Sequence, residues 1–352
     1  MMNAISRDAP RSLRGVLVFL ILFLVFLLVV LVSTGMGYIP ILPGQVLKVI
    51  LAKILGRPDL LGGLDRVVPT VIWDVRLPRI LTAAVVGCGL SVSGVVFQGI
   101  LLNPLADPYT LGVSAGAAFG ASIALLLEIP FLGLYAVPVF AFAGSLLTLL
   151  FVLSISSFEG RIASNNLILS GIIVATILSA GISFIKYVAD EQVSVIIFWL
   201  LGSFNSRTWT DVFLTFGMVV LGGGFCLYFA RDLNVMALGD RVAMSLGVHA
   251  DRTRTALLVV ASLVASVCVA VSGIIGFVGL VIPHLMRFVV GSDNRILIPT
   301  SALLGGILLL FADTVTRAVL PHEIPIGVLT AIIGGPVFCY IFRKNRGRMI
   351  HG

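Results

Sequence analysis

The sequence predicts an all-α integral membrane protein with about ten transmembrane helices. Of its 352 residues, 59% are hydrophobic and 11% are charged, whereas soluble globular chains carry about 25% charged residues. Apolar runs recur along the whole chain, and no polar stretch is long enough for a separate soluble domain. We therefore expect residues 1–352 to form a single transmembrane domain, with lipid around much of its surface.

Ten segments are long and apolar enough, or nearly so, to cross about 30 Å of hydrocarbon as helices of about 20 residues. They are residues 15–35, 79–101, 110–128, 131–154, 166–187, 211–230, 255–273, 275–291, 298–318 and 324–342. The eighth is glycine-rich and interrupted by Pro283, so we expect a broken helix there, enclosed by protein or by a water-filled cavity. The apolar segment 193–202 is too short to span, and we expect it to lie as a helix at one surface.

The first span follows Arg7, Arg11 and Arg14, an arrangement that a secretory signal peptide also has. Its apolar run, from Val16 to Val32, is longer than the roughly 7–15 residues of a signal peptide. We interpret it as a retained span.

Basic residues set the expected orientation. An even number of spans puts both termini on one side of the membrane. The basic tails at both ends and the basic loop 231–254 then share one face, which their arginines identify as cytoplasmic. Residues 36–78 become a long outer loop, and its basic residues are not explained by topology alone.

Several other classes of protein are disfavoured. The net charge of +7 does not indicate nucleic-acid binding, because the basic residues flank apolar runs. The cysteines lie in apolar runs without a C-x-x-C pair, which favours small buried side chains over a disulfide or zinc framework. They are Cys88, Cys226, Cys268 and Cys339. The histidines lack the i, i+4 spacing of metal ligands, so we expect no metal site.

Asp313 is the only acidic residue deep in an apolar run, and Arg317 follows one helical turn later. Side chains at i and i+4 meet on one helix face, and an unpaired charge in lipid costs roughly 2.5–3.5 kcal/mol. We expect the two to pair and to face protein or water. A proton-coupled carrier needs a chain of such groups, which the sequence lacks. His284, beside Pro283, either faces a water-filled route or hydrogen-bonds a freed backbone carbonyl.

Glycines 112, 116 and 120 recur every four residues, a spacing that lets two membrane helices approach closely. Gly112-Val113-Ser114-Ala115-Gly116 also matches a nucleophile elbow. That motif needs a strand before the serine, whereas this one opens an apolar helix, so we favour helix packing and expect no catalytic residue. None of the four lysines follows a glycine, so the chain has no Walker A loop and no ATP site of that kind.

A short repeat links the two halves of the chain. Ser93-Gly94-Val95-Val96 is followed by Phe97-Gln98-Gly99, and Ser272-Gly273-Ile274-Ile275 is followed by Phe277-Val278-Gly279. The two stretches lie about five spans apart, and an odd offset gives them opposite orientations. We infer an inverted repeat of the kind that transporters contain.

Five motifs in order resemble the FecCD family of importer permeases, which carry iron–siderophores, haem and cobalamin. They are Val75–Arg79, Asn103–Pro108 after Gln98-Gly99, Leu111–Gly116, Gly276–His284 and Glu323–Gly327. The resemblance covers residues from about 70 to 342. It implies a ten-span subunit that forms a homodimer or pairs with a related chain, with the translocation path between the two subunits, in the cytoplasmic membrane of a bacterium or archaeon.

The resemblance also implies partners and their contact sites. Two ATPase subunits would hold ATP-Mg on the cytoplasmic side, this chain would bind no cofactor, and a periplasmic or lipid-anchored binding protein would dock outside. Docking falls to Arg76, Arg79 and Arg317, and the inner gate to Ser164 and Asn165. Coupling to the ATPase falls to a helix–turn–helix in loop 231–254. Its residues are Ala237, Leu238, Gly239, Asp240, Leu246, Gly247 and Val248.

The function we predict is therefore the permease subunit of an ATP-driven importer for a metal chelate. Iron–siderophore leads as cargo because it is the commonest in the family, while haem, cobalamin and molybdate-type oxyanions stay open. A secondary transporter is the distant alternative, and a membrane enzyme that uses Ser114 is another. An ATPase partner that co-purifies with the chain would distinguish the importer permease from the secondary transporter and from the membrane enzyme.

Overall fold

The computed structural model of the protein describes residues 11–37, 39–158, 161–162, 164–318 and 323–349. The helices are α1 (Arg11–Gly35), α2 (Pro43–Leu55), α3 (Val67–Thr70), α4 (Leu77–Leu101), α5 (Val113–Leu127), α6 (Ala136–Ser156), α7 (Ser164–Val188), α8 (Val193–Leu200), α9 (Trp209–Tyr228), α10 (Ala230–Met236), α11 (Asp240–Ser245), α12 (Ala250–Ser272), α13 (Val278–Val290), α14 (Asn294–Ala318) and α15 (Ile326–Met349). One antiparallel hairpin pairs β1 (Ser157–Phe158) with β2 (Arg161–Ile162).

Within the described residues, seven helices are long and apolar enough to span a membrane, and the shorter apolar helices α5, α13 and α15 bring the number to ten. Each of the ten falls on a predicted span, so the predicted fold class is confirmed. The short apolar segment after the fifth span forms α8, as expected. The protein is a multi-pass membrane protein.

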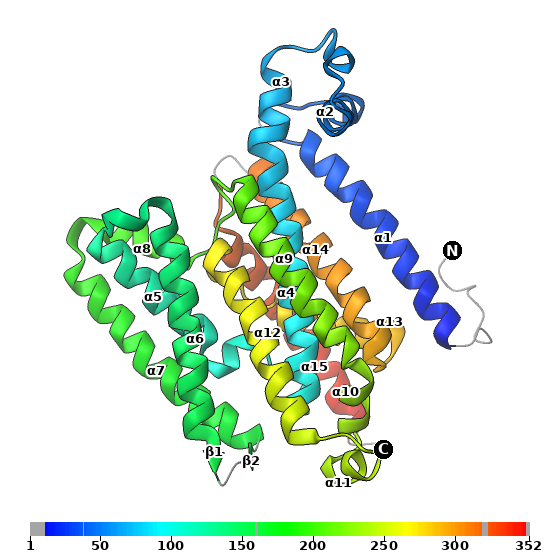
Figure 1. Ribbon diagram of the computed structural model, residues 1–352, viewed down its shortest axis with the longest axis vertical. Coiled ribbons are helices and arrows are strands. Elements are labelled where there is room, and N and C mark those ends of the chain that lie inside the picture. Colours follow the sequence, from blue (N-terminus) through cyan, green and yellow to red (C-terminus); the bar gives the residue numbers. More distant parts are fainter. Residues whose placement is uncertain (1–10, 38, 159–160, 163, 319–322, 350–352) are drawn as a thin grey trace.

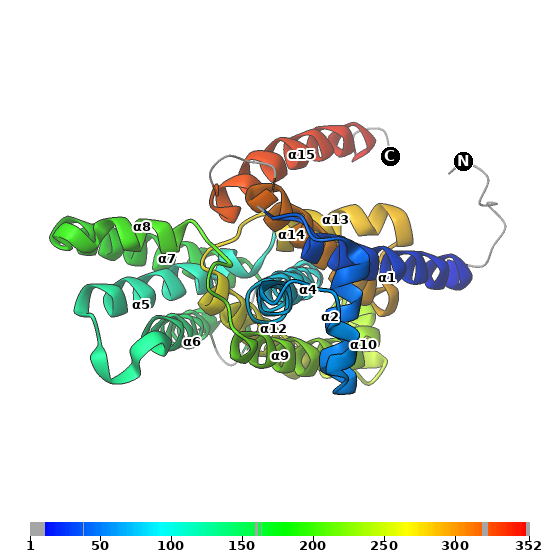
Figure 2. The same ribbon diagram turned by 90° about the horizontal axis from the view of Figure 1, so that it is seen from above.

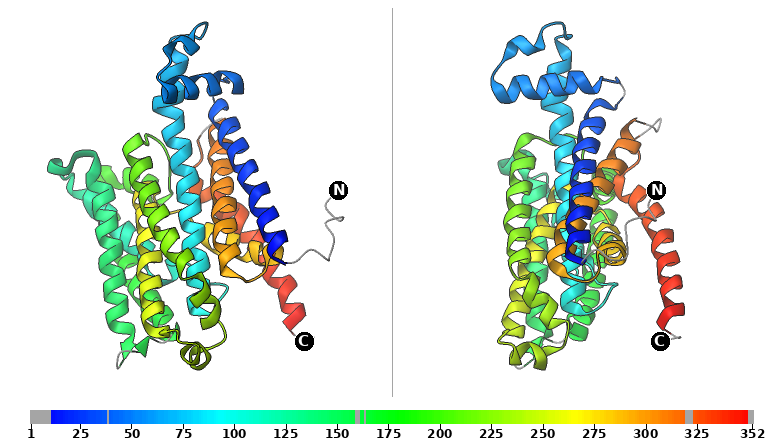
Figure 3. Two further views of the ribbon diagram at one scale, coloured as in Figure 1. Left: turned by 45° about the vertical axis from the view of Figure 1, so that its right-hand side comes forward. Right: turned by 90° about the vertical axis from the view of Figure 1, so that its right-hand side faces the viewer.

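The helices run roughly along the long axis of the molecule (Figure 1). We call its two ends the α2 end, where α2 and α3 lie, and the α11 end, where α11, the β hairpin and the last turns of α15 lie (Figures 1 and 3). Helix α4 descends from the α2 end, whereas α12 rises from the α11 end. The two halves of the sequence repeat thus run in opposite directions.

Helix α4 lies at the centre of the bundle, with α9, α12, α13 and α14 around it (Figure 2). Its neighbours come close because glycines face them. A Cβ at Gly94 would lie 1.8 Å from the carbonyl oxygen of Gly279 in α13, and one at Gly87 would lie 2.3 Å from that of Gly305 in α14. Small residues allow such backbone contact between membrane helices, so α4 forms the packed stem of the molecule.

The predicted outer loop 36–78 is largely helical. It contains α2, and α3 continues through a π-helical turn, Val71–Arg76, directly into α4. Trp209 at the start of α9 fastens this extension, since its Nε1 donates to the Trp73 carbonyl at 3.0 Å and the two indole rings lie 4.9 Å apart. The α2 end is therefore a folded cap over the stem.

The break near the eighth span lies before the helix rather than at Pro283. The chain leaves α12 at Gly273 and enters α13 after Phe277, both with positive φ, and Pro283 lies inside continuous α13. A proline removes the hydrogen bond to the carbonyl four residues earlier, here that of Gly279. Gln98 of α4 donates to this carbonyl at 3.4 Å and to that of Leu280 at 3.1 Å. Gln98 thus serves the freed carbonyl, the role proposed for His284.

Candidate functional site

A charge cluster lies at the α2 end and consists of Arg79, Asp313, Arg317 and Glu323. Asp313 of α14 is fully buried. Arg79 of α4 donates from Nε to its Oδ1 at 2.9 Å, and Arg317 Nε lies 3.7 Å from its Oδ2. The predicted pair between Asp313 and Arg317 is therefore present, and Arg79 is a second, closer partner.

Glu323 balances the cluster. Its Oε1 lies 3.2 Å from Arg79 Nη1, which also donates to Asn205 Oδ1. Two guanidinium groups thus face two carboxylates, which offsets the cost of holding these charges at a partly buried site. A polar cavity of about 260 Å³ opens beside Arg79 and Glu323, between the loop after α8 and the start of α15.

Arg76 has a different environment. It is 8% exposed, and its guanidinium donates to the carbonyls of Thr34, Gly35 and Ile39 at 3.1, 3.0 and 2.6 Å. Arg317 donates to the carbonyls of Ser33 and Met36. The last carbonyls of a helix have no partner within that helix, so these arginines complete the C-terminal end of α1.

The structure therefore brings the three predicted docking arginines together, but with their guanidinium groups turned inward. The exposed basic side chains at the α2 end lie on the cap. They are Lys48, Lys53, Arg57 and Arg66, of which Arg57 pairs with Asp59 at 2.9 Å. The motif identified the arginines by type, but burial could not be read from the sequence.

At the α11 end, loop 231–254 forms the two short helices α10 and α11, joined by Gly239 with a φ of +102°. The predicted coupling residues form the turns on either side of α11, with residues 237–240 before or at its start and residues 246–248 after it. Leu238 is 65% exposed and Leu246 is 62% exposed, next to exposed Met244. Arg254 fixes the turn from α12 by its 2.7 Å contact with Asp240. Exposed apolar side chains outside the spans mark this face as a contact surface.

Helix α10 is joined to the turn between α13 and α14. Asn234 donates to Asp293 at 2.7 Å and accepts from the backbone N–H of Asn294 at 2.9 Å. The Arg295 side chain, which hydrogen-bonds Asp293, lowers the pKa of that carboxyl to about 2 against the effect of burial. Asp293 thus stays ionised at neutral pH. Because Asn234 hydrogen-bonds both Asp293 and Asn294, a displacement of α10 would also move the start of α14.

The predicted gate residues begin α7, directly after the β hairpin at the α11 end. Ser164 is the first residue of the helix, and its side chain lies outside what the structure describes. Asn165 is exposed. The hairpin that precedes them pairs Ser157 with Ile162, which makes the connection from α6 short.

A polar cavity of about 430 Å³ lies between α5 and α7. Hydroxyl groups line it from both helices, Ser114 from α5 and Ser179 and Ser183 from α7, and Lys186 adds an ammonium group. Thr176, Ser179, Ser183 and Lys186 recur at helical spacing, so they form one polar stripe along α7. We call these four residues the α7 stripe. Figure 2 shows α7 and α8 along the same side of the molecule as α15.

The predicted packing glycines lie beside this cavity. A Cβ at Gly116 would lie 2.5 Å from the Gly144 carbonyl oxygen, and one at Gly120 would lie 2.0 Å from that of Phe140, both in α6. Gly112 instead precedes α5 with a φ of +75° and faces Gly171 of α7. These contacts hold α5 tightly against α6 and leave the Ser114 side open to the cavity.

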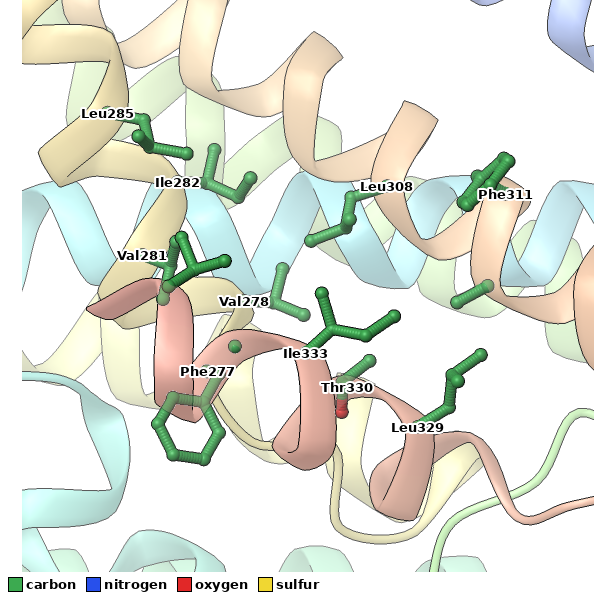
Figure 4. A pocket seen from close by; sticks show the side chains of 13 residues that line it. Phe277, Val278, Val281, Ile282, Leu285, Leu308, Phe311, Leu329, Thr330 and Ile333 are labelled. Atoms are coloured by element: carbon green, nitrogen blue, oxygen red, sulfur yellow. The ribbon is translucent and has the colours of Figure 1, made fainter. Parts of the chain in front are cut away.

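A third cavity, of about 230 Å³, separates α15 from α13 and α14 (Figure 4). Apart from Thr330 its labelled side chains are apolar, among them Phe277, Leu308 and Ile333. Such a lining fits hydrocarbon and offers nothing to orient a polar solute. The polar cavity on α7 is therefore the better candidate for a solute route.

Three residues of these sites were not predicted from the sequence: Glu323 as a charge partner, Asn205 and Lys186. Glu323 and Asn205 meet Arg79 only through the fold, across 244 and 126 positions of sequence. The spacing of Thr176, Ser179, Ser183 and Lys186 was visible in the sequence and is the signal that would have found the α7 stripe. Within the described residues, no group of three or more His, Cys, Asp or Glu is placed to hold a metal ion.

The fold and these surfaces define the class as a transport permease rather than an enzyme, and comparisons with known proteins agree. Residues 23–344 match the model of the FecCD transport family. The chain belongs to this family and is a permease subunit of an ABC importer.

Individual relatives extend the match. The chain is 42% identical to the cobalamin import system permease protein BtuC of Halobacterium salinarum, over 82% of this chain and 77% of the relative. It is 36% identical to the Fe(3+)-citrate import system permease protein YfmE of Bacillus subtilis, over 96% and 98%. Other relatives are named for hemin and for molybdate. A solved metal-chelate type ABC transporter in an inward-facing conformation has a TM-score of 0.79 and 35% identity, covering 93% of this chain and 98% of that one.

Proposed function

We propose that this permease imports a metal chelate as a homodimer, with iron–siderophore the leading cargo. The observation that carries the proposal is the α7 stripe. It is a row of exposed hydroxyls ending in a lysine, on a helix that also exposes apolar side chains such as Ile177 and Phe184. Thr176 and Ser183 donate to carbonyls within α7, at 2.8 and 3.0 Å, whereas the lysine at the end of the row needs water or a polar partner. Two copies that met through this side would enclose a polar conduit.

Haem, cobalamin and molybdate stay alternative cargoes on the same scaffold. The relatives differ in the cargo that their names state, although they share the fold with this chain. Hydroxyl groups form weak, adaptable contacts, so the conduit itself discriminates little. Recognition then rests mainly with a periplasmic or lipid-anchored binding protein.

ATP hydrolysis belongs to two separate ATPase subunits in this proposal, and they would contact the exposed apolar face around α11. Their closure would move α11, and the hydrogen bonds of Asn234 would carry that movement to α14. The α11 end is then cytoplasmic and both termini lie inside. The membrane is the cytoplasmic membrane of a bacterium or archaeon.

Docking of the binding protein falls to the α2 end. Lys48, Lys53 and Arg66 are exposed there and would steer an acidic partner surface. Arg79 and Arg317 act beside them at the charge cluster, while Arg76 holds the cap in place.

The test is reconstitution in proteoliposomes with a candidate ATPase and binding protein, with uptake measured against ATP. Leu238→Arg should abolish ATPase association and uptake, because it places a charge in an apolar contact. Leu42→Arg is the matched control, since Leu42 is similarly exposed, at 69%, but lies at the α2 end. Uptake that persists without any ATPase would refute the proposal and favour a secondary transporter.

A further inference from the structure

The polar cavity between α5 and α7 contains one charged group. Lys186 is the single charged residue among those described that line it, and no acidic residue shares the lining. Its other polar groups are the hydroxyls of Ser114, Ser179 and Ser183, and Tyr109, whose hydroxyl donates to the Ile275 carbonyl. The single charge in the lining is therefore positive.

Lys186 has no ion-pair partner among the described residues. The neighbouring acids Asp190 and Glu191 lie beyond the end of α7 and do not line the cavity. Glu128, at the end of α5, accepts instead from the Gln192 side chain at 2.9 Å. The ammonium group is thus free to act on a solute.

Its position favours the cavity over lipid. Ser179, Ser183 and Lys186 follow one another at i, i+4 and i+7, so they share a face of α7. Phe184 is exposed on another side of the helix, at 67%. Lys186 lies in the last turn of α7, where it is half-buried and lines the cavity together with the two serines of its face.

We propose that Lys186 makes this cavity an anion-selecting point of the conduit, so that the cargo is a metal chelate with net negative charge, such as one bearing free carboxylates. This inference rests on the proposed function. In a homodimer, two copies of Lys186 would face one conduit, an arrangement like the rings of basic residues in anion pores. A lysine acts as a compact point charge without the two-pronged geometry of arginine. It attracts an anionic solute without fixing its orientation, which suits a site that must release its cargo.

Cysteine labelling tests the charge without knowledge of the cargo. Exposed Cys339 is first replaced by serine, and Ser183→Cys then reports on the cavity. Its rate with the anionic reagent methanethiosulfonate ethylsulfonate is divided by its rate with the cationic trimethylammonium analogue. Lys186→Met should lower this ratio about threefold or more at low ionic strength, because a unit charge nearby acts oppositely on the two reagents.

Ile177→Cys is the matched control, since Ile177 lies on α7 at 63% exposure but outside the cavity, and its ratio should not depend on Lys186. If the ratio of labelling rates at Ser183→Cys is the same with lysine or methionine at position 186, the ammonium group does not act on the cavity and the inference is overturned. A neutral or cationic ligand retained by the partner binding protein would overturn it as well. ATP-driven uptake with an unchanged ratio would reject the inference and keep the proposed function. A ratio that depends on Lys186, in a protein without ATP-driven uptake, would keep the charge of the cavity and reject the proposed function.

Discussion

Helices α4 and α7 each contain 25 residues, and both were recognised as spans from the same kind of apolar run. Their surroundings differ. Of the most apolar 18 residues, 83% are buried in the first and 28% in the second. Helix α4 contacts its neighbours through glycines and through the ion pair of Arg79 with Asp313. Helix α7 instead exposes a polar stripe and apolar side chains. The difference separates a packed stem that holds the fold from an exposed helix face, which is where we propose that a second copy binds.

The largest expected effect comes from removing the anion of the charge cluster. Asp313→Ala removes the buried carboxylate from between Arg79 and Arg317, and leaves Arg79 only the partly exposed Glu323. We expect a loss of about 3–5 kcal/mol in the free energy of unfolding, because a buried charge loses its partner. Thermal unfolding in detergent, followed by circular dichroism, measures it. The control is Asp59→Ala in the exposed pair with Arg57, which should change stability by less than about 1 kcal/mol. Equal effects would mean that the cluster does not hold the stem.

A second variant tests the contact between α4 and α13. Gly94→Ala adds a methyl group where the Gly279 carbonyl oxygen lies 1.8 Å away. The helices must separate, and we expect a loss of about 1–3 kcal/mol or more. Gly223→Ala in α9 is the control, because nothing lies within 4 Å of its added Cβ. That change should be neutral or slightly stabilising, since alanine favours helix over glycine. Tolerance of Gly94→Ala would contradict the close packing of the stem.

A third variant asks whether the stem responds to the α11 end. Asn234→Ala removes the hydrogen bonds that join α10 to Asp293 and Asn294, at an expected loss of about 1–2 kcal/mol. In proteoliposomes with the ATPase, we expect ATP hydrolysis to continue while uptake per ATP falls several-fold. Thr255→Ala is the control, because the hydrogen bond that its hydroxyl donates lies within α12, to the Asp251 carbonyl. Unchanged uptake per ATP in Asn234→Ala would remove this link from the mechanism.

The smallest effect on the single chain is expected on α7. Phe184 is 67% exposed, so Phe184→Ala should change the stability of a detergent-solubilised monomer by less than about 0.5 kcal/mol. If this side of α7 faces a second copy, the same variant should lower the fraction of dimer, measured by light scattering during size-exclusion chromatography. A stability loss as large as that of Gly94→Ala would show that α7 belongs to the stem.

Much of the fold could be predicted because hydrocarbon imposes it. Every backbone polar group in lipid must find a partner within the chain, so each long apolar run has to be a helix. This rule placed all ten spans and the short helix α8. The rule did not locate the break at Gly273 to Phe277, because Pro283 was the more evident interruption in the sequence. In the structure, Gln98 donates to the carbonyl that Pro283 leaves without a backbone donor, so the helix continues past the proline.

The sequence by itself determined the membrane class, the number of spans, the family motifs and the pair of Asp313 and Arg317, since each depends on composition or on spacing within a few residues. Only the tertiary structure decided that Arg76 binds carbonyls of α1, that Glu323 balances Arg79, and that Lys186 lines a cavity with serines of two helices. Burial and charge pairing are properties of groups that meet across distant segments. The order of residues alone does not specify which of those segments touch.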